Sequence, residues 1–388
     1  MPVLWPIEYY EQNNYESLKK RFVSGIEINL RKNMTIRITA LDALRGMAAL
    51  AVVIFHFTMH YQVAGKLFFS TGCMGVDLFF VISGFVIFMT IERTKSWKDF
   101  VWNRFARLYP AYWACVSFTA LLFVFKFKFL VHAQNNEVNG RYFLRYLANM
   151  TMIQYYFNIE DIDGPYWTLI IELLFYLFVI VIINLRKLNY ISQTGFIISA
   201  FCACYSLPPF FNNYYIHALL VAIPLLAYFP LFYAGIILYK MKFGEVTIPK
   251  LAAFLSTFIF QCLMFTNCYK NHHLITIYQY IPALTLIYGL FLLFLYDKIN
   301  FMVNPVTLWL GRISYSLYLF HQFIGIELLI PAFMKYLKLS FWPSAGLALC
   351  IVLILVNLIN KYIERPSQIY LKNKNPFRSL TGNSLRMV

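Results

Sequence analysis

Long apolar segments follow one another in this sequence from about residue 40 to residue 363, and they constrain the fold more than any other feature. A helix of about 20 apolar residues crosses the roughly 30 Å hydrocarbon core of a bilayer. Such spans are predicted near 40–60, 74–92, 108–131, 166–185, 191–210, 216–239, 249–267, 274–296, 306–330 and 342–363. The sequence therefore predicts an all-α, polytopic integral membrane protein with about ten transmembrane helices.

The composition favours the same fold class. Hydrophobic residues make up 60% of the 388 residues and charged residues only 13%, whereas about a quarter of the residues in a soluble domain are charged. The seven cysteines show no paired or metal-ligand spacing, so we expect neither a disulfide framework nor a metal site. A shorter stretch, 142–157, carries Arg145 and Asn149 and is predicted to be interfacial or re-entrant.

The formal net charge of +16 has a topological explanation. If the N-terminus is cytoplasmic, most Lys and Arg residues fall in cytoplasmic connections, as the positive-inside rule requires. An even number of spans then places both termini in the cytoplasm, and no nucleic-acid partner is needed. We expect a cytoplasmic N-terminal segment at 1–37 without a signal peptide, a membrane domain at 38–366 and a cytoplasmic tail at 367–388.

The first span pairs a cation with a histidine. Arg45 and His56 are eleven residues apart, which places them within about 20° of one helix face and about 16 Å apart along the axis. An anion binder near the inner end and a proton acceptor near the outer end would fit this spacing. An equally weighted interpretation is that Arg45 anchors the helix to lipid headgroups and that His56 is an interfacial histidine.

Two further features point to charge-dependent chemistry. Arg104 and Arg107 lie three residues apart before the third span, a spacing at which two guanidinium groups fork a phosphate, although membrane anchoring explains them too. Glu172 is an isolated carboxylate within the fourth span, and an intramembrane carboxylate is seldom purely structural. The predicted topology places Glu172 at a depth near His56, where it would orient the imidazole.

Other polar residues interrupt the second and ninth spans. A polar stripe within an apolar helix faces neighbouring helices or a water-filled path. Simpler explanations are that the aspartate in the second span caps its helix and that the serine and tyrosine hydroxyl groups in the ninth form hydrogen bonds between helices. These residues are Asp77 and Ser83 in the second span, and Arg312, Ser314, Tyr318 and His321 in the ninth.

Together these segments resemble the acyltransferase family 3 membrane proteins, which modify bacterial surface glycans, over about residues 37–366. The matching motifs occur in the family's order: Arg45 with His56, the sequence GVDLFFVISGF, Arg104 with Arg107 and Pro110, Trp167 to Tyr176, Ser314 to His321, and Glu364 with Pro366. Longer members add an extracytoplasmic SGNH hydrolase-like domain, which this sequence lacks. We therefore expect the membrane domain, alone or with a partner, to complete the transfer.

The resemblance implies an O-acyltransferase in the bacterial inner membrane with no tightly bound cofactor. Its donor would be cytoplasmic acyl-CoA, most commonly acetyl-CoA, and its acceptor a glycan or lipid-linked saccharide such as O-antigen or exopolysaccharide. Arg45, Arg104, Arg107 and Arg312 would hold the donor phosphates, His56 would act as general base, and Glu172 would fix its tautomer.

Several alternatives stay open at this stage. Transfer could be direct or could pass through an acyl-enzyme, with Ser83 as the nucleophile. A transporter or polysaccharide flippase could use the intramembrane His, Glu and Asp residues as a proton relay, although the repeated halves typical of transporters are not visible in the sequence. The sequence does not indicate an oligomeric state.

Overall fold

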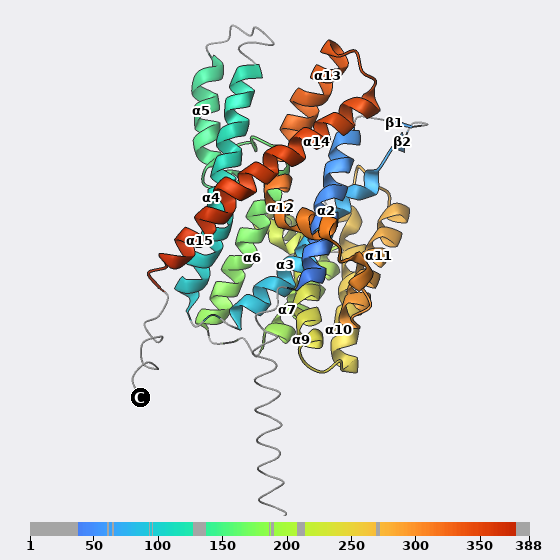
Figure 1. Ribbon diagram of the computed structural model, residues 1–388. Helices are drawn as coiled ribbons and strands as arrows, with labels where there is room; N and C mark the ends of the chain where they lie inside the picture. Colours follow the sequence, from blue (N-terminus) through green and yellow to red (C-terminus); the bar gives the residue numbers. More distant parts are fainter. Residues whose placement is uncertain are drawn as a thin grey trace, which may run out of the picture. The chain divides into compact units, whose positions relative to one another are not determined.

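The computed structural model describes residues 38–377, apart from 60–61, 64–65, 93, 95, 127–136, 186, 188–189, 208–213 and 269–271. Within these residues the chain is mainly helical (Figure 1). Nine of the described helices are long and apolar enough to cross a membrane. The predicted all-α, polytopic membrane fold is confirmed. The N-terminal segment at 1–37 and the end of the predicted tail, 378–388, lie outside the described residues.

The first part of the chain contains the helices that carry most of the predicted site. They are α2 (Thr39–Thr58), η1 (Ser70–Met74), α3 (Gly75–Ile91), α4 (Trp97–Phe125), α5 (Glu137–Asn149), η3 (Gln154–Phe157), η4 (Gly164–Tyr166), α6 (Trp167–Asn184) and α7 (Ile191–Tyr205). Between α2 and η1, the two-residue strands β1 (Gln62–Val63) and β2 (Lys66–Leu67) pair antiparallel.

The second part ends in two long composite helices. Its elements are α8 (Tyr214–Ala222), η7 (Pro224–Tyr228), α9 (Phe229–Lys242), α10 (Ile248–Cys268), α11 (Ile277–Leu295), η8 (Asn300–Met302), α12 (Pro305–Gln322), η9 (Phe323–Leu329), α13 (Ile330–Tyr336), α14 (Phe341–Ile359), η10 (Asn360–Glu364) and α15 (Arg365–Asn373). The π-helical segments η9 and η10 join α12 to α13 and α14 to α15 without a break. The predicted boundary at residue 366 therefore falls inside a continuous helix.

Two predicted spans differ from the helices observed. The span expected at 191–210 is α7, which has only 15 residues and is shorter than the nine long helices of the described chain. The span expected at 216–239 is divided into α8, η7 and α9. Pro224 and Pro230 stand in the first turns of η7 and α9. Proline has no backbone N–H to donate to the preceding turn of a helix, so each proline marks the beginning of a new helical segment.

The third span begins earlier than predicted. Helix α4 starts at Trp97, so Arg104 and Arg107 lie inside it and not in a preceding connection. Ser96 caps its first turn by accepting a hydrogen bond from the backbone N–H of Lys98. The stretch predicted to be interfacial forms α5 and η3, and α5 lies alongside the far end of α4 (Figure 1).

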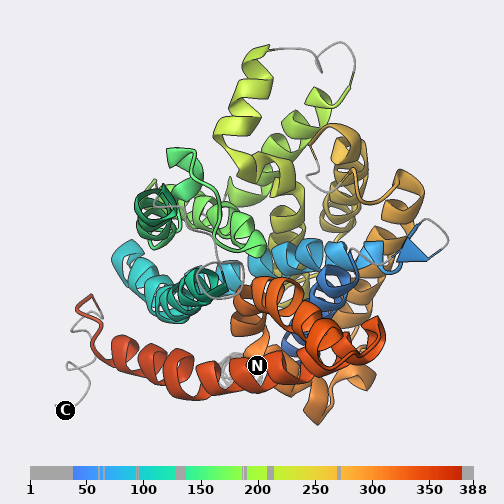
Figure 2. The same ribbon diagram turned by 90° about the horizontal axis from the view of Figure 1, so that it is seen from above.

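Glycine contacts hold α2 against its neighbours. A Cβ atom at Gly311 of α12 would overlap the carbonyl oxygen of Asp42 on α2, and one at Gly46 would lie 2.5 Å from the backbone nitrogen of Gly311. Small residues at a helix crossing let two backbones approach closely. Figure 2 shows α2 between α3 and the C-terminal helices. This crossing brings the polar faces of α2 and α12 together.

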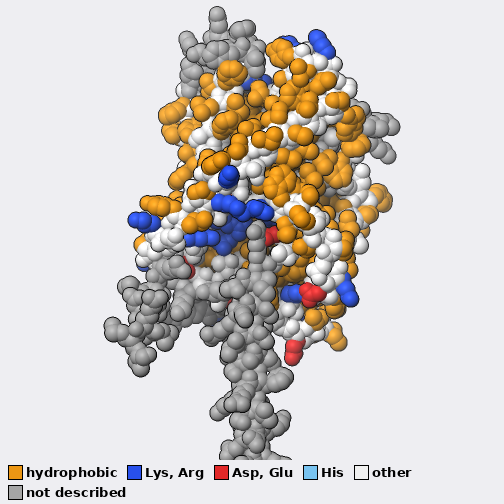
Figure 3. All heavy atoms as spheres, in the orientation of Figure 1, with side chains coloured by type: hydrophobic (Ala, Val, Ile, Leu, Met, Phe, Trp, Pro, Cys, Tyr) orange, Lys and Arg blue, Asp and Glu red, His pale blue; other side chains and the backbone are white. Residues whose placement is uncertain are grey.

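Basic residues gather at one end of the described bundle, which we call the basic end. Here α2 and α4 begin and α3, α6, α9 and α15 end, and Figure 3 shows Lys and Arg side chains below a largely hydrophobic surface. Lys98 lies at the start of α4, Lys240 and Lys242 in the last turn of α9, and Lys372 in the last turn of α15. We call the other end of the bundle the distal end.

Candidate functional site

A narrow cavity runs between α2, α3, α4, α6 and α12, and we call it the central cavity. Its polar lining is drawn from residues far apart in the sequence. These are Arg45, Ser83, Arg107, Thr168, Glu172, Ser314, Tyr315 and Tyr318. Six of them were predicted as site residues from the sequence. The close α2–α12 crossing at Gly46 and Gly311 explains how Arg45 and Ser314 reach the same space.

Cations gather on the side of the cavity toward the basic end. Arg45 forms an ion pair with Asp42 at 3.8 Å and also lies within electrostatic range of Arg107 and Glu172. The Nη2 atom of Arg104 donates a hydrogen bond to Oγ1 of Thr90 at 3.2 Å. Several guanidinium groups so close together repel one another, so the site is well suited to a polyanionic ligand.

Arg104 separates the central cavity from the basic end. Its guanidinium carbon lies 5.9 Å from the centre of the Tyr176 ring. The Tyr176 hydroxyl in turn donates a hydrogen bond to the Glu172 carboxylate, which lines the cavity. The buried Nε atom of Arg104 has no hydrogen-bond partner in the described part of the chain. A ligand that reaches the cavity from the basic end would therefore meet Arg104 first.

A histidine pair lies beyond the cavity, toward the distal end. His56 is in the last turn of α2 and His321 in the last turn of α12. The Nε2 atom of His321 lies 2.9 Å from Nδ1 of His56. His321 is buried and His56 is half-buried. The sequence identified both residues but did not predict their contact.

The hydrogen bonds of His321 determine the tautomer of His56. Nδ1 of His321 lies 3.0 Å from the carbonyl oxygens of both Leu317 and Tyr318. Carbonyl oxygens only accept, so this Nδ1 carries the proton and Nε2 of the neutral ring is an acceptor. His56 must then donate from Nδ1 to His321. The lone pair of His56 therefore lies on Nε2, where it can accept a proton from a substrate.

Glu172 has different partners from those predicted. Its carboxylate accepts a hydrogen bond from the Tyr176 hydroxyl and attracts the Arg45 guanidinium, and both of these residues lie nearer the basic end. His56 is instead hydrogen-bonded to His321. The predicted Glu172–His56 pair is thus absent from the described hydrogen bonds. The sequence estimate of depth along the helix did not include the lateral packing that brings α12, rather than α6, against the end of α2.

Tyr318 connects the cavity to the histidine pair. Its hydroxyl lies 2.9 Å from Oγ1 of Thr168 and donates to the carbonyl oxygen of Pro165 at 3.2 Å. The Tyr318 and His321 ring centres are 6.1 Å apart. Because Tyr318 also lines the cavity, it forms a shared wall between the two groups of residues.

Three predicted residues lie away from the central cavity. Arg312 is exposed on α12 and does not line the central cavity, so its contact with the donor phosphates stays a prediction. Asp77 is fully buried in the first turn of α3, where its charge acts on Tyr280 and Tyr288 of α11. Trp167 packs against Tyr228, with ring centres 5.7 Å apart. Neither α11 nor η7 contributes a described residue to the lining of the central cavity.

Asp163 is a structural contributor that the sequence analysis missed. Its buried Oδ1 atom accepts hydrogen bonds from the backbone N–H of Gly164 at 2.9 Å and of Phe323 at 3.1 Å. Phe323 follows His321 by two residues, so this contact fixes the end of α12. Burial raises the pKa of the Asp163 carboxyl to about 7. Its position directly before Gly164 and Pro165 was the available signal, because Asp favours helix N-caps.

The motif at the end of the domain also has a positioning role. Ser316 Oγ donates to Oε2 of Glu364 at 2.6 Å, and Asn360 Nδ2 donates to the same oxygen at 2.9 Å. Glu364 is buried. It therefore ties η10 to the same helix, α12, that presents Ser314, Tyr318 and His321.

Comparisons with known proteins identify the family of this chain. The family model of acyltransferase family 3, described as an acyltransferase domain, matches residues 38–366. O-acetyltransferase OatA of Staphylococcus aureus is 30% identical over 177 residues, which are 41% of this chain and 27% of that protein. The O-acetyl transferase of Shigella phage Sf6 is 29% identical over 147 residues, 35% of this chain and 43% of that protein.

A third relative is matched over more of its length. ORF330 of Acidianus two-tailed virus, an acetyltransferase by its name, is 24% identical over 307 residues, 75% of this chain and 84% of that protein. The matches span less than half of the OatA and phage proteins. No solved structure matches the chain. Since the family model covers nearly all the described helices and every motif of the site, the chain belongs to acyltransferase family 3.

Proposed function

We propose that the protein transfers an acetyl group from acetyl-CoA to a hydroxyl group of a glycan. The observation that carries this proposal is the order of groups along the bundle. Arg104, Arg107 and Arg45 lie toward the basic end, the central cavity follows, and the His56 lone pair lies beyond it. This order suits a donor with a polyanionic end and a reactive thioester at the other end of a long arm.

Two features of the relatives and the fold support the choice of substrates. Among the relatives, a Listeria monocytogenes protein is named a peptidoglycan O-acetyltransferase, which supports both acetyl as the cargo and a glycan as the acceptor. The concentration of Lys and Arg at the basic end supports a cytoplasmic location for that end, with the distal end facing outward from a bacterial inner membrane. The donor would then enter from the cytoplasm.

A pocket at the distal end supports a saccharide acceptor. It has a volume of about 470 Å³ and lies beside the first turn of α6. Aromatic side chains offer it flat amphipathic surfaces, while amide and carboxylate groups offer hydrogen bonds. The lining includes Tyr155, Tyr156, Asn158, Asp161 and Trp167. Trp167 of this pocket is followed in the sequence by Thr168 of the central cavity.

The proposed reaction uses His56 as its base. Nε2 of His56 accepts the proton of the acceptor hydroxyl as its oxygen forms a bond to the thioester carbonyl carbon. The carbon–sulfur bond then breaks, and the His56 imidazolium returns its proton to the departing CoA sulfur. His321 accepts the Nδ1–H hydrogen bond throughout and keeps the imidazole oriented. His321 is thus a positioning residue.

Direct transfer is the simpler of the two routes. An acyl-enzyme would need a nucleophile with its own base, and Ser83 lines the central cavity without a hydrogen bond to a histidine in the described chain. His56 by contrast is half-buried and already holds the required tautomer. The reaction can therefore proceed without a covalent intermediate.

The full-length protein in nanodiscs provides the test. With labelled acetyl-CoA and no acceptor, a transferase should release free acetate slowly, whereas a transporter or flippase should not. Mass spectrometry of surface glycans should show an acetyl group that disappears when the gene is deleted. Reporters fused to either terminus should both read as cytoplasmic. Absence of both acetyl-CoA turnover and glycan acetylation would refute the proposal.

A further inference from the structure

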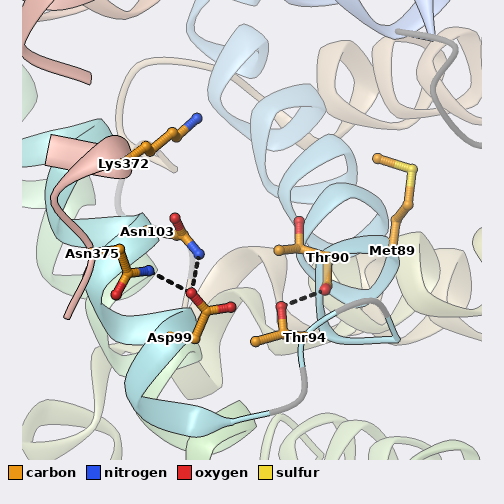
Figure 4. Close-up of a pocket in the computed structure, with 7 residues that line it drawn as sticks. All are labelled: Met89, Thr90, Thr94, Asp99, Asn103, Lys372 and Asn375. Atoms are coloured by element: carbon orange, nitrogen blue, oxygen red, sulfur yellow. Dashed lines mark hydrogen bonds between the residues drawn. The ribbon is translucent and has the colours of Figure 1, made fainter. Parts of the chain in front are cut away.

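A separate pocket of about 370 Å³ opens at the basic end, between α3, α4 and the end of α15, and we call it the basic-end pocket. Figure 4 shows polar side chains from all three segments around it. The ones used below are Thr90, Thr94, Asp99, Asn103, Lys372 and Asn375. None of the motifs in the sequence analysis accounts for Asp99, Lys372 or Asn375.

One wall of this pocket is a preformed hydrogen-bond network. Oδ1 of Asp99 accepts from Nδ2 of Asn103 at 3.0 Å and also from Nδ2 of Asn375. Figure 4 shows the other carboxylate oxygen pointing away from both amides, toward the Thr94 side of the pocket. An oriented carboxylate flanked by amides can bind the amino group and ring nitrogens at the edge of a purine base.

The wall formed by the end of α15 also supplies positive charge. Lys372 is exposed on α15, and the charged groups that act on its ammonium are Arg107 and Arg104. Both are cations, so the three side chains repel one another in this structure. An anion with several negative charges would relieve that repulsion. The wall therefore favours a phosphorylated ligand over a neutral one.

The basic-end pocket and the central cavity lie along the same pair of helices. On α3, Val76, Phe80 and Ser83 line the cavity, while Thr90, two turns beyond Ser83, lines the pocket. On α4, Asp99 and Asn103 line the pocket and Arg107, one turn further, lines the cavity. Arg104, bonded to Thr90, stands between them. One long ligand could thus occupy both spaces if this side chain moves.

We propose that the basic-end pocket binds the adenosine 3′-phosphate end of the donor, with Lys372 contacting the 3′-phosphate and the Asp99 network contacting the adenine edge. The inference rests on the proposed function, in which the donor is an acyl-CoA. The pyrophosphate then lies at Arg104 and Arg107, and the pantetheine arm enters the central cavity. The pocket selects the nucleotide and takes no part in the chemistry.

Lys372→Ala is the decisive variant, because its effect should depend on one phosphate of the ligand. The affinities of the full-length protein in nanodiscs for CoA and 3′-dephospho-CoA are measured by calorimetry. Wild-type protein should bind CoA about tenfold more tightly than 3′-dephospho-CoA, as expected for one charge-assisted contact. Lys372→Ala should lose most of that preference by weakening CoA alone. Equal weakening of both ligands, or an unchanged preference, would overturn the assignment.

Lys374→Ala is the matched control. Lys374 lies two residues beyond Lys372, is exposed, and its ammonium lies 5.9 Å from the centre of the Tyr370 ring. This variant removes the same charge but should keep the wild-type preference for CoA. If Lys374→Ala reduces the preference as much as Lys372→Ala does, net surface charge and not a phosphate site is responsible.

Asp99→Ala tests the base end of the pocket. It should raise the KM for acetyl-CoA about tenfold to a hundredfold, the effect of losing a hydrogen bond to a charged group. The KM for acetyl-4′-phosphopantetheine, which has no nucleotide, should not change. A matching rise for both donors would overturn the subsite, since Asp99 would then act through the fold. If wild-type protein transfers acetyl from neither donor, the proposed function itself fails.

Discussion

Nε2 of His321 lies 2.9 Å from Nδ1 of His56, although the two residues are 265 positions apart in the sequence. This contact joins two separate motifs, and in the proposed reaction the pair accepts the proton of the acceptor hydroxyl. His321 receives its own orientation from the Leu317 and Tyr318 carbonyls, and Asp163 fixes the chain just after it. In the proposed reaction the base, His56, is therefore oriented by His321, which is itself held by two backbone carbonyls and by the contact of Asp163 with the following turn.

The first prediction separates the two histidines. His56→Ala should lower acetyl transfer by about 10² to 10⁴, the usual contribution of a general base, without weakening CoA binding. His321→Ala should cause a smaller loss, because the base remains but its tautomer is no longer fixed. Initial rates of labelled acetate release and CoA affinity test both. His273→Ala, at an exposed position before α11, is the control. Equal activity of His56→Ala and wild type would mean that the base is elsewhere.

The second prediction concerns Glu172. Its carboxylate lies beside Arg45 and offsets part of the positive charge of the cavity. Glu172→Gln should therefore bind CoA more tightly than wild type, since a polyanion meets less negative charge. Calorimetric titration with CoA gives the comparison. Unchanged affinity together with a loss of transfer like that of His56→Ala would instead favour the sequence-based role in orienting His56.

Features that depend on one helix alone could be predicted from the sequence, whereas contacts between helices could not. The spans were predictable because lipid demands long apolar helices. The Arg45–His56 spacing was equally predictable because both residues lie on one helix. The partner of His56 was not, since it depends on which helix crosses α2. That crossing is set by Gly46 and Gly311, whose contact no periodicity reveals.

Asp163 and the basic-end pocket show the same limit. Asp163 acts through a hydrogen bond to the backbone of Phe323, and a backbone donor leaves no mark in the sequence. Lys372 and Asn375 follow the last predicted span and look like an ordinary basic tail. They become part of a pocket because η10 continues α14 into α15, which then packs along α4, where Trp102 Nε1 donates to the Leu371 carbonyl.

The third prediction tests the phosphate-binding role of Arg107. Arg107→Ala should weaken CoA binding by about 1.5 to 3 kcal/mol, the value of a hydrogen bond to a charged group. Arg107→Lys should restore part of this loss, because an ammonium keeps the charge but not the planar fork. Arg312→Ala serves as the control, since Arg312 is exposed outside the cavity. A larger loss from Arg312→Ala than from Arg107→Ala would reverse the placement of the donor.

The fourth prediction concerns the α2–α12 crossing. Gly311→Ala should lower the stability of the protein by about 1 to 3 kcal/mol, because the added methyl group overlaps the Asp42 carbonyl oxygen. Gly289→Ala on α11 is the matched control, since a Cβ there meets nothing within 4 Å. Thermal unfolding in detergent should show a lower Tm for the first variant and an equal or higher Tm for the second. Equal Tm values for Gly311→Ala and wild type would show that the crossing tolerates a methyl group.

The last prediction follows from the buried Asp163 carboxyl. Burial raises its pKa from 3.8 to about 7, while the N–H groups of Phe323 and Gly164 act in the opposite direction. The folded state therefore holds this proton more tightly than the unfolded state, so its contribution to stability decreases as the pH rises from about 4 to about 7 and is constant above that. Asp163→Asn keeps an acceptor oxygen for both N–H groups but cannot ionise. Its Tm should consequently fall less than that of wild type between pH 5 and pH 7. Asp297→Asn, which removes an exposed carboxylate paired with Lys242, should keep the wild-type slope. Parallel Tm profiles for Asp163→Asn and wild type over this range would show that Asp163 does not carry the pH dependence.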